Sequence, residues 1–257
     1  MPYNIGNNTS EQKEKLLSKS LETLLEDFGR GNATPGSGSA AALMALLASS
    51  TICALAKLTH EKRKNLEKKK ELQSIFNNLE EEISPNLKRL FERDTEVFQR
   101  SIDARVHRDK LNKELEEIEN IPENKEIIEE KKSLIKICQN TANTTLREAN
   151  GTLFEIISYS VKVFNYSCRM WSIGLTYAKG DAGAGINSSL AAVSTCLLVA
   201  HVNVQTAIKD KLAWVHDAKM KCDTIQELLH DMQERAQMII QNSRKETVAK
   251  IVISSGI

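Results

Sequence analysis

The sequence contains few of the residues that break helices or build sheets. Only four of its 257 residues are proline, and aromatic residues make up 5%. With so few aromatics and few alternating apolar and polar runs, almost no strand is indicated. Nearly every segment instead places its apolar residues at the helical period. We therefore expect an all-α fold.

Charge imbalance and cysteine motifs are lacking as well. Lys and Arg number 35 against 34 Asp and Glu, so the net charge is +1, and nothing attracts the chain as a whole to nucleic acid or to an anionic membrane. The five cysteines are dispersed, without a C-x-x-C motif or zinc-ligand spacing. This pattern indicates reduced thiols in the cytoplasm and no metal site. Residues 1–20 are polar and lack a secretory signal pattern.

The chain divides into helices separated by glycine-rich or proline-containing segments. Thr9 and Gln12 resemble a capping box for a first helix, which would continue through an apolar stripe to Phe28. A second helix opens at Ser39, and a break is expected at Pro85. The expected helices are 9–28, 39–58, 70–83, one from about 85, 133–178, 186–214 and 217–252.

Two of these helices consist largely of small residues. Residues 40–56 and 186–214 are rich in Ala and Ser, and each follows an expected glycine-rich loop, 29–38 and 180–185. The first apolar stretch is shorter than the roughly 20 residues that a membrane span requires. Both helices are therefore expected at the centre of the protein, packed closely against each other or against a second copy.

Residues 106–132 differ from the rest of the chain. Charged residues dominate this segment, apolar residues are sparse, and Pro122 lies near its middle. We interpret it as a helical hairpin or mobile excursion with its tip at 120–124, inserted into a single domain of residues 1–257. A solvated surface or a partner-binding arm would both fit this composition.

Several polar residues stand out as candidates for a site. Gly36, Ser37, Gly38 and Ser39 open a buried helix and could offer backbone N–H groups, with Ser39 as its cap, although a simple tight turn explains them equally well. The segment is not a phosphate-binding P-loop, since no Gly-Lys-Ser/Thr follows.

A carboxylate and three further polar groups lie along the expected helices. Asp94 shares a helical face with Leu90 and Phe98, where burial could raise its pKa for proton transfer, or a nearby cation could simply pair with it. Asp181 would ordinarily be a helix cap, Asn203 a structural clamp, and Lys62-Arg63 a helix C-terminal basic cluster.

Taken together, these motifs resemble the cyclodeaminase/cyclohydrolase family, which includes the C-terminal domain of formimidoyltransferase-cyclodeaminase and methenyltetrahydrofolate cyclohydrolases. The likeness covers roughly residues 16–229. It is carried by Pro35-Gly36-Ser37-Gly38-Ser39-Ala40-Ala41, by Leu58-Thr59 followed by Lys62-Arg63, by Asp94-Thr95-Glu96-Val97-Phe98, by Gly180-Asp181, and by Asn203-Val204.

The resemblance implies a bundle of long antiparallel helices, a homodimer, and an enzyme that opens or forms the N5–N10 methenyl bridge of tetrahydrofolate. It further implies no bound cofactor or metal, a tetrahydrofolate derivative as substrate, and no nucleic-acid or membrane partner. Asp94 would transfer protons, with Asp181 as the second candidate. Gly36, Ser37, Gly38 and Ser39 would shape the pocket, Asn203 would hydrogen-bond the pterin or the reacting nitrogen, and Lys62 and Arg63 would meet the glutamate tail.

The sequence departs from the family pattern at Ser37, which replaces a glycine, at Ala207, which replaces an asparagine, and in the charged insertion. Two alternatives therefore stay open: a non-catalytic helical dimer that acts as a binding or interaction protein, and an enzyme of the same fold that acts on a different cyclic amidine.

Overall fold

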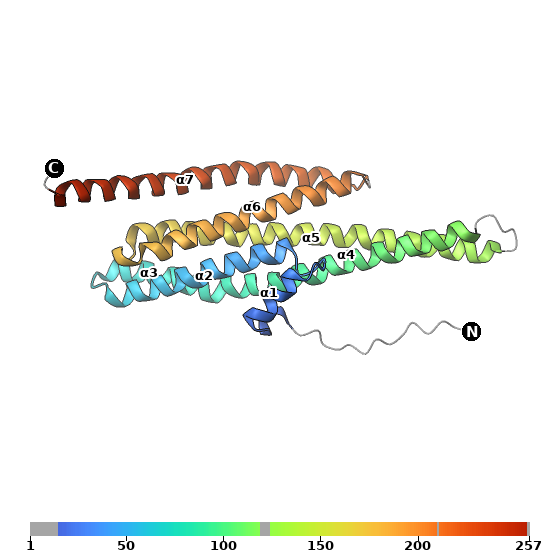
Figure 1. Cartoon of the computed structure of the whole chain (residues 1–257), viewed down its shortest axis with the longest axis horizontal. Coiled ribbons are helices and arrows are strands. Elements are labelled where there is room, and N and C mark those ends of the chain that lie inside the picture. The colour runs from blue at the N-terminus through green and yellow to red at the C-terminus, as the bar shows by residue number, and fades with distance from the viewer. Residues whose placement is uncertain (1–14, 119–123, 210, 256–257) are drawn as a thin grey trace.

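The computed structural model describes residues 15–118, 124–209 and 211–255, and its side chains up to residue 248. Throughout this part of the chain the secondary structure is helical and no strand occurs, which confirms the all-α prediction. The elements are η1 (Leu16–Ser18), α1 (Leu21–Gly29), α2 (Ser37–Lys62), α3 (Leu66–Asn78), η2 (Leu79–Ile83), α4 (Ser84–Ile118), α5 (Lys125–Ile173), η4 (Thr176–Ala178), α6 (Lys179–Lys209) and α7 (Val215–Ser255). The long helices lie side by side in a bundle (Figure 1).

The two helices of small residues lie at the centre of the bundle, as predicted. α2 packs against α6, α4, α5 and α3, and α6 packs against α5, α2 and α7. The residues that face the interior are mostly small, with Ala41, Ala42 and Ala45 in α2 and Ala182, Ala192 and Ala200 in α6. Small side chains permit close approach of the two backbones, and most of the largest fully buried side chains come from the neighbouring helices, as with Phe91 and Phe164.

α2 and the run Thr176–Lys209 are both long and apolar enough to cross a membrane, judged by length and composition alone. In the most apolar window of α2, 61% is buried inside the protein, and in that of the second run 44% is buried. The apolar surface of α2 is therefore largely used by its neighbours in the bundle, as expected of a central helix.

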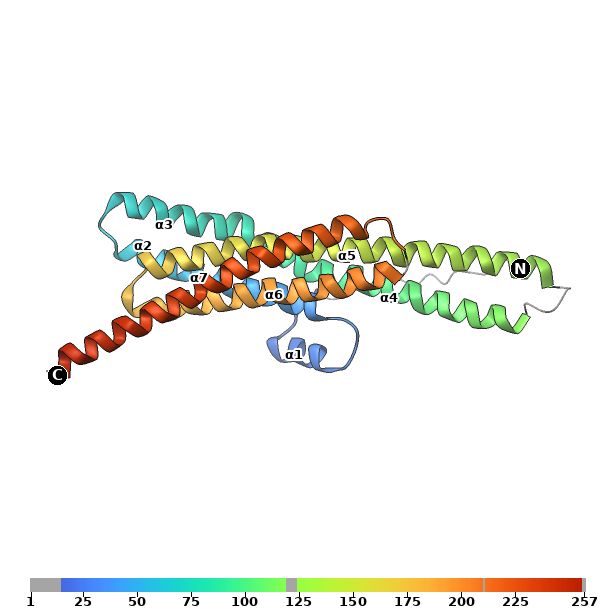
Figure 2. The same ribbon diagram turned by 90° about the horizontal axis from the view of Figure 1, so that it is seen from above.

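The N-terminal helix begins later than predicted. Thr9 and Gln12 lie outside the described residues, and the stripe is broken into the turn η1 and the helix α1. Ser20 starts α1, because its Oγ accepts the backbone N–H of Thr23 at 3.1 Å. Of the predicted apolar stripe, Leu24 is buried but Leu21 is 68% exposed. α1 lies beside the bundle as a small separate element (Figure 2).

The predicted start of a new helix near Pro85 is confirmed, since α4 begins at Ser84, but the chain is not interrupted there. α3, η2 and α4 follow one another without a gap, and the five residues of η2 form a π-helical turn immediately before Ser84 and Pro85. A proline inside an α-helix lacks one N–H and crowds the preceding turn. A wider π turn at that point relieves this conflict, and the chain continues as one helical run.

The predicted loop at 180–185 is also wrong, since all of these residues belong to α6. The close contact of three helices explains at least one of the glycines. A Cβ built on Gly185 would lie 2.6 Å from Ile52 Cδ1 and 2.6 Å from Ser167 Oγ. Glycine here allows α2, α5 and α6 to meet closely, and makes no turn.

The charged segment forms a helical hairpin, as predicted. Its two arms are the end of α4 and the start of α5, and they extend past the rest of the bundle (Figures 1 and 2). Lys131 pairs with Glu114, and Arg108 Nη1 donates to Gln139 Oε1 at 2.5 Å across the two arms. The predicted tip at 120–124 lies almost entirely outside the described residues.

All five cysteines are buried and free.

Candidate functional site

Asp94 lies on the inner face of α4, against the first turn of α2. The residue is only 7% exposed. Ser39 Oγ donates to Asp94 Oδ2 at 2.8 Å, and the backbone N–H of Ser39 donates to the same carboxyl group. Ser39 Oγ also lies 2.9 Å from Thr95 Oγ1, so Thr95 can donate to the hydroxyl that holds Asp94. The carboxyl group is thus fixed by two donors from a single residue of α2.

Gly38 makes this contact possible. A Cβ on Gly38 would lie 2.2 Å from Asp94 Oδ1 and 2.6 Å from Asp94 Cγ, which is far inside van der Waals contact. Only glycine therefore allows the start of α2 to lie directly against the carboxyl group. The sequence offered Gly38 as a candidate site residue, and in the structure it lies directly against Asp94.

The cap of α2 differs from the prediction. The helix begins at Ser37, so Gly36 is the N-cap residue and the hydroxyl of Ser39 serves Asp94 instead of capping the helix. The carbonyl of Gly36 accepts the N–H of Ala40 at 2.9 Å. Ser37 is exposed at this turn.

Two opposing effects act on the charge of Asp94. Burial raises the pKa of its carboxyl group, and the hydrogen bonds from Ser39 partly oppose this shift. On α6, burial and the nearby Asp94 carboxylate together raise the pKa of the Cys196 thiol far above its ordinary value. Cys196 is therefore a neutral neighbour, and Asp94 is a carboxyl group that can gain or lose a proton in a poorly solvated position.

A cavity of about 250 Å³ opens beside Thr95, the residue that follows Asp94 on α4, and Asp94 itself is not part of its lining. Thr34 and Pro35 of the segment before α2 line one part of it, and Thr95 and Glu96 of α4 line another. Thr95 connects the cavity to Asp94 through Ser39. Thr34 Oγ1 donates to Gln99 Oε1 at 2.7 Å, which ties the entry segment to α4. The cavity is large enough to admit part of a small organic ligand.

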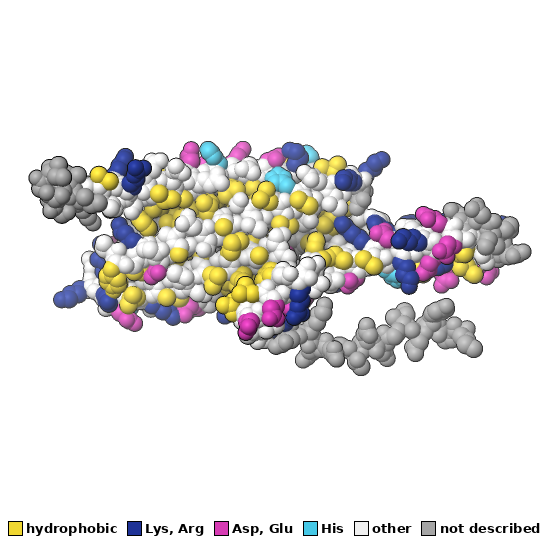
Figure 3. Space-filling view, in the orientation of Figure 1, with side chains coloured by type: hydrophobic (Ala, Val, Ile, Leu, Met, Phe, Trp, Pro, Cys, Tyr) yellow, Lys and Arg dark blue, Asp and Glu magenta, His cyan; other side chains and the backbone are white. Residues whose placement is uncertain are grey.

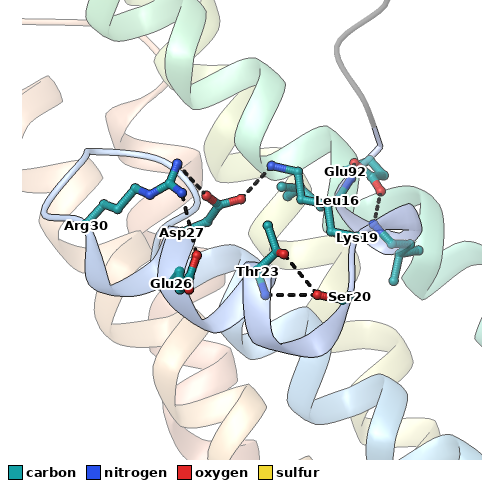
Figure 4. Close-up of polar contacts among 9 residues, drawn as sticks. Leu16, Lys19, Ser20, Thr23, Glu26, Asp27, Arg30 and Glu92 are labelled. Carbon is teal, nitrogen blue, oxygen red and sulfur yellow. Dashed lines mark hydrogen bonds and ion pairs between the residues drawn. The ribbon is translucent and has the colours of Figure 1, made fainter.

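The N-terminal elements form the outer wall of the same cavity. The backbone N–H groups of Leu16 and Leu17 donate to the two carboxylate oxygens of Glu92 at 3.0 and 2.9 Å. Lys19 Nζ lies 2.5 Å from Asp27 Oδ2, and this contact together with Arg30 lowers the pKa of Asp27. Figure 4 shows these contacts between η1, α1 and α4.

The remaining predicted residues do not all gather at Asp94. Asn203 is 5% exposed and lies two turns beyond Cys196 on α6, toward the same end of the bundle. Lys62 and Arg63 end α2, where Lys62 Nζ lies 2.6 Å from Tyr177 Oη and Arg63 Nη2 donates to the carbonyl of Ile173 at 2.8 Å.

Asp181 is exposed in the first turn of α6 and belongs to that second group. With a rise of about 1.5 Å per residue, α2 separates Gly38 from Lys62 by roughly 36 Å. Within one chain, Lys62, Arg63 and Asp181 are thus remote from Asp94.

Sequence reasoning did not single out Thr95, Cys196 or the N-terminal wall of Lys19 and Glu92. Thr95 could have been found, because it directly follows Asp94 in the sequence. Cys196 and Glu92 reach the site only through helix packing, which no local pattern indicates. In the described ranges 15–118, 124–209 and 211–255, no group of three or more His, Cys, Asp or Glu is placed to hold a metal ion.

Comparison with known proteins gives two positive findings. The model of the formiminotransferase-cyclodeaminase family matches residues 20–224, a range that includes Asp94 and every other predicted site residue. The crystal structure of formiminotetrahydrofolate cyclodeaminase from Thermotoga maritima is similar, with a TM-score of 0.65 and 14% sequence identity over 88% of this chain and 98% of that one. At this identity the likeness shows a shared fold.

No curated protein matches the sequence. The family match, however, covers most of the chain and spans α1 to the beginning of α7. The predicted resemblance is confirmed, and the chain belongs to the formiminotransferase-cyclodeaminase family, a family of enzymes that process folates.

Proposed function

We propose that the protein is a cytoplasmic enzyme that opens or forms the N5–N10 methenyl bridge of a tetrahydrofolate derivative beside Asp94. The observation that carries this proposal is the buried carboxyl group of Asp94, which lies against Gly38 and is held by Ser39, with Thr95 linking Ser39 to a nearby cavity. A carboxyl group of raised pKa is a stronger base when ionised and retains its proton more readily, so it can both accept and return a proton.

Two reactions fit this arrangement. In cyclohydrolysis, a water oxygen bonds to the methenyl carbon and loses a proton to the Asp94 carboxylate. The bond from that carbon to one ring nitrogen breaks, and the nitrogen receives a proton. In cyclodeamination, N10 bonds to the formimino carbon and gives up its proton, and the amino group on that carbon gains a proton and leaves as ammonia. A single carboxyl group beside the bridge could transfer the proton in either reaction.

The remaining predicted residues have different places in this proposal. Gly36, Ser37 and Gly38 would shape the pocket at the start of α2, and Asn203 would hydrogen-bond the pterin or the reacting nitrogen. Lys62 and Arg63 would bind the glutamate tail. Because one chain holds them roughly 36 Å from Gly38, they could do so only from a second copy. Asp181 shares that remote end of α2 and is the weaker catalytic candidate.

We propose that this second copy is the partner in a homodimer. Large apolar side chains are exposed on both central helices, with Leu47 of α2 60% exposed, and Leu198 and Val202 of α6 65% and 59% exposed. Figure 3 shows hydrophobic side chains gathered over this part of the molecule. An apolar face on the most central helices is typical of a surface covered by a partner. A two-fold axis would pair the same face on each chain.

The test follows the loss of methenyltetrahydrofolate absorbance with purified protein, with the Asp94→Asn variant, and with buffer alone. We expect acceleration by the wild type, and a loss of at least about 100-fold in the variant, in line with removal of an acid-base group. Near-wild-type turnover by a folded Asp94→Asn variant would exclude this role for Asp94.

A wild-type protein that does not act on the methenyl compound would next be given formiminotetrahydrofolate, with ammonia release as the readout. Turnover there would assign cyclodeamination. Inactivity with both compounds, together with saturable folate binding, would favour the non-catalytic binding module.

A further inference from the structure

A second cavity lies on another side of the bundle, between the middle of α5 and the start of α7. Its volume is about 140 Å³. A single water requires about 10–15 Å³ measured in this way, so the space can hold a small solute. It is lined from α5 by Arg147, Asn150 and Gly151, by Trp214 just before α7, and from the start of α7 by Asp217 and Lys221. Asp94 is held instead by α2 and lies near Cys196 of α6.

The floor of this cavity carries two buried polar groups without partners. Asn150 is 2% exposed, and neither its Oδ1 nor its Nδ2 has a hydrogen-bond partner among the described residues. The indole Nε1 of Trp214 is likewise buried with no acceptor in that part of the chain. Buried amide and indole groups nearly always have partners, because an unmade hydrogen bond costs stability. Three unsatisfied atoms around one cavity therefore indicate a ligand that satisfies them.

Gly151 points to the same conclusion independently. It lies in the interior of α5, where glycine is less favourable than alanine. Unlike Gly38 and Gly185, it is not required by a close contact, since a Cβ at this position would meet nothing within 4 Å. The missing side chain keeps the cavity open.

The chemistry of the lining defines the ligand. The N–H groups of Asn150 and Trp214 require acceptors, and the cationic Arg147 and Lys221 at the rim favour an anion. Lys221 Nζ also lies 5.6 Å from the centroid of the Phe154 ring. A carboxylate meets these requirements. Asn150 Oδ1 requires a donor instead, and the carboxylate of Asp217 favours a cation near it.

We propose that this cavity binds a small free α-amino acid, whose carboxylate faces Asn150 Nδ2, Trp214 Nε1 and Arg147. Its ammonium group faces Asn150 Oδ1 and Asp217. The site is independent of the proposed folate chemistry, because its lining comes from α5, Trp214 and the start of α7 alone.

The experiment measures thermal unfolding and calorimetric titration of the full chain with glycine and L-serine as probes, and with acetate and methylamine as controls. We expect saturable binding of the amino acids and much weaker binding of either control. Asp94→Asn should bind glycine as the wild type does. If acetate bound as well as the amino acids, the site would be an anion site and not an amino-acid site. If neither amino acid bound saturably, the proposal would be overturned.

Two variants separate binding from folding. Asn150→Leu removes the unpartnered amide, so we expect the ligand-free protein to melt at the same or a higher temperature, with glycine affinity reduced at least about tenfold. Gly151→Ala should also fold well, and its added methyl group should weaken binding. Glycine binding that survives Asn150→Leu would contradict the assignment.

Discussion

At the scale of single residues, the site depends on a carboxyl group that the fold both buries and holds. Ser39 supplies the hydroxyl and backbone donors, Gly38 supplies the space, and Cys196 adds a neutral, poorly solvated neighbour. Burial in such a position makes the ionised form costly. Burial of this carboxyl group therefore underlies both the function proposed for Asp94 and the effect of Asp94 on stability.

The pH dependence of stability should reveal this cost. Burial raises the pKa of Asp94 in the folded state above its ordinary value. The folded state then binds the proton more tightly, so the stability from protonated Asp94 is present at low pH and lost as pH rises through the folded pKa.

Asp94→Asn should thus have an equal or higher free energy of unfolding at neutral pH, measured with urea. The difference between wild type and variant should shrink toward pH 4. A variant that is much less stable at neutral pH would contradict this account.

Gly38→Ala tests the close contact directly. The new Cβ would lie 2.2 Å from Asp94 Oδ1, so α2 or the carboxyl group must move. We expect a loss of about 1–3 kcal/mol in the free energy of unfolding and a larger proportional loss of turnover. Ser37→Ala, at an exposed position one residue earlier, is the matched control and should stay within about 0.5 kcal/mol of wild type. Equal behaviour of the two variants would show that the contact is unimportant.

At the scale of the helices, the predictions succeeded where periodicity decides structure and failed where packing does. The helical stripes and the central position of α2 followed from residue type and spacing. The segment 180–185 was predicted as a loop because several glycines in a short stretch ordinarily indicate a turn. In the structure, Gly185 serves the close contact with Ile52 and Ser167, which depends on residues far apart in sequence. Pro85 marked the start of α4 correctly, but the π turn that joins α3 to α4 without a gap has no sequence signal of its own.

A pair of glycine substitutions in α6 tests this explanation. Gly185→Ala places a methyl group 2.6 Å from Ile52 Cδ1, and we expect a loss of about 1–3 kcal/mol in the free energy of unfolding. Gly180→Ala is the matched control on the same helix, since a Cβ there meets nothing within 4 Å. It should be neutral or stabilising by up to about 1 kcal/mol, because alanine is the better helix former. Thermal unfolding followed by circular dichroism compares the two. A stable Gly185→Ala protein would remove the packing argument.

At the scale of the whole molecule, the sequence predicted the family, but it did not predict how the candidate site residues are arranged in space. Asp94, Gly38 and Ser39 meet as the motifs indicated. Lys62 and Arg63 were grouped with them because the family motifs occur in order along the chain. Order in sequence does not give distance in space, and the length of α2 places these residues at its far end. A single chain cannot bring the two groups together, so they would meet only across the homodimer that we propose.

The proposed homodimer should come apart when charges are placed in its apolar face. Glutamate at both Leu47 and Leu198 would place charges in the proposed apolar interface, so we expect the double variant to be monomeric by sedimentation or light scattering. Ile137→Glu, at a residue 56% exposed on the hairpin, is the control and should leave the dimer intact. If the second copy supplies Lys62 and Arg63, the monomer and a Lys62→Ala/Arg63→Ala dimer should both show a raised KM for folates with several glutamates, and smaller changes for folates with one. A double variant that remains dimeric would place the interface elsewhere. A monomer with an unchanged KM would show that Lys62 and Arg63 do not bind the glutamate tail. Their role would then be the structural contacts that they make with Tyr177 and Ile173.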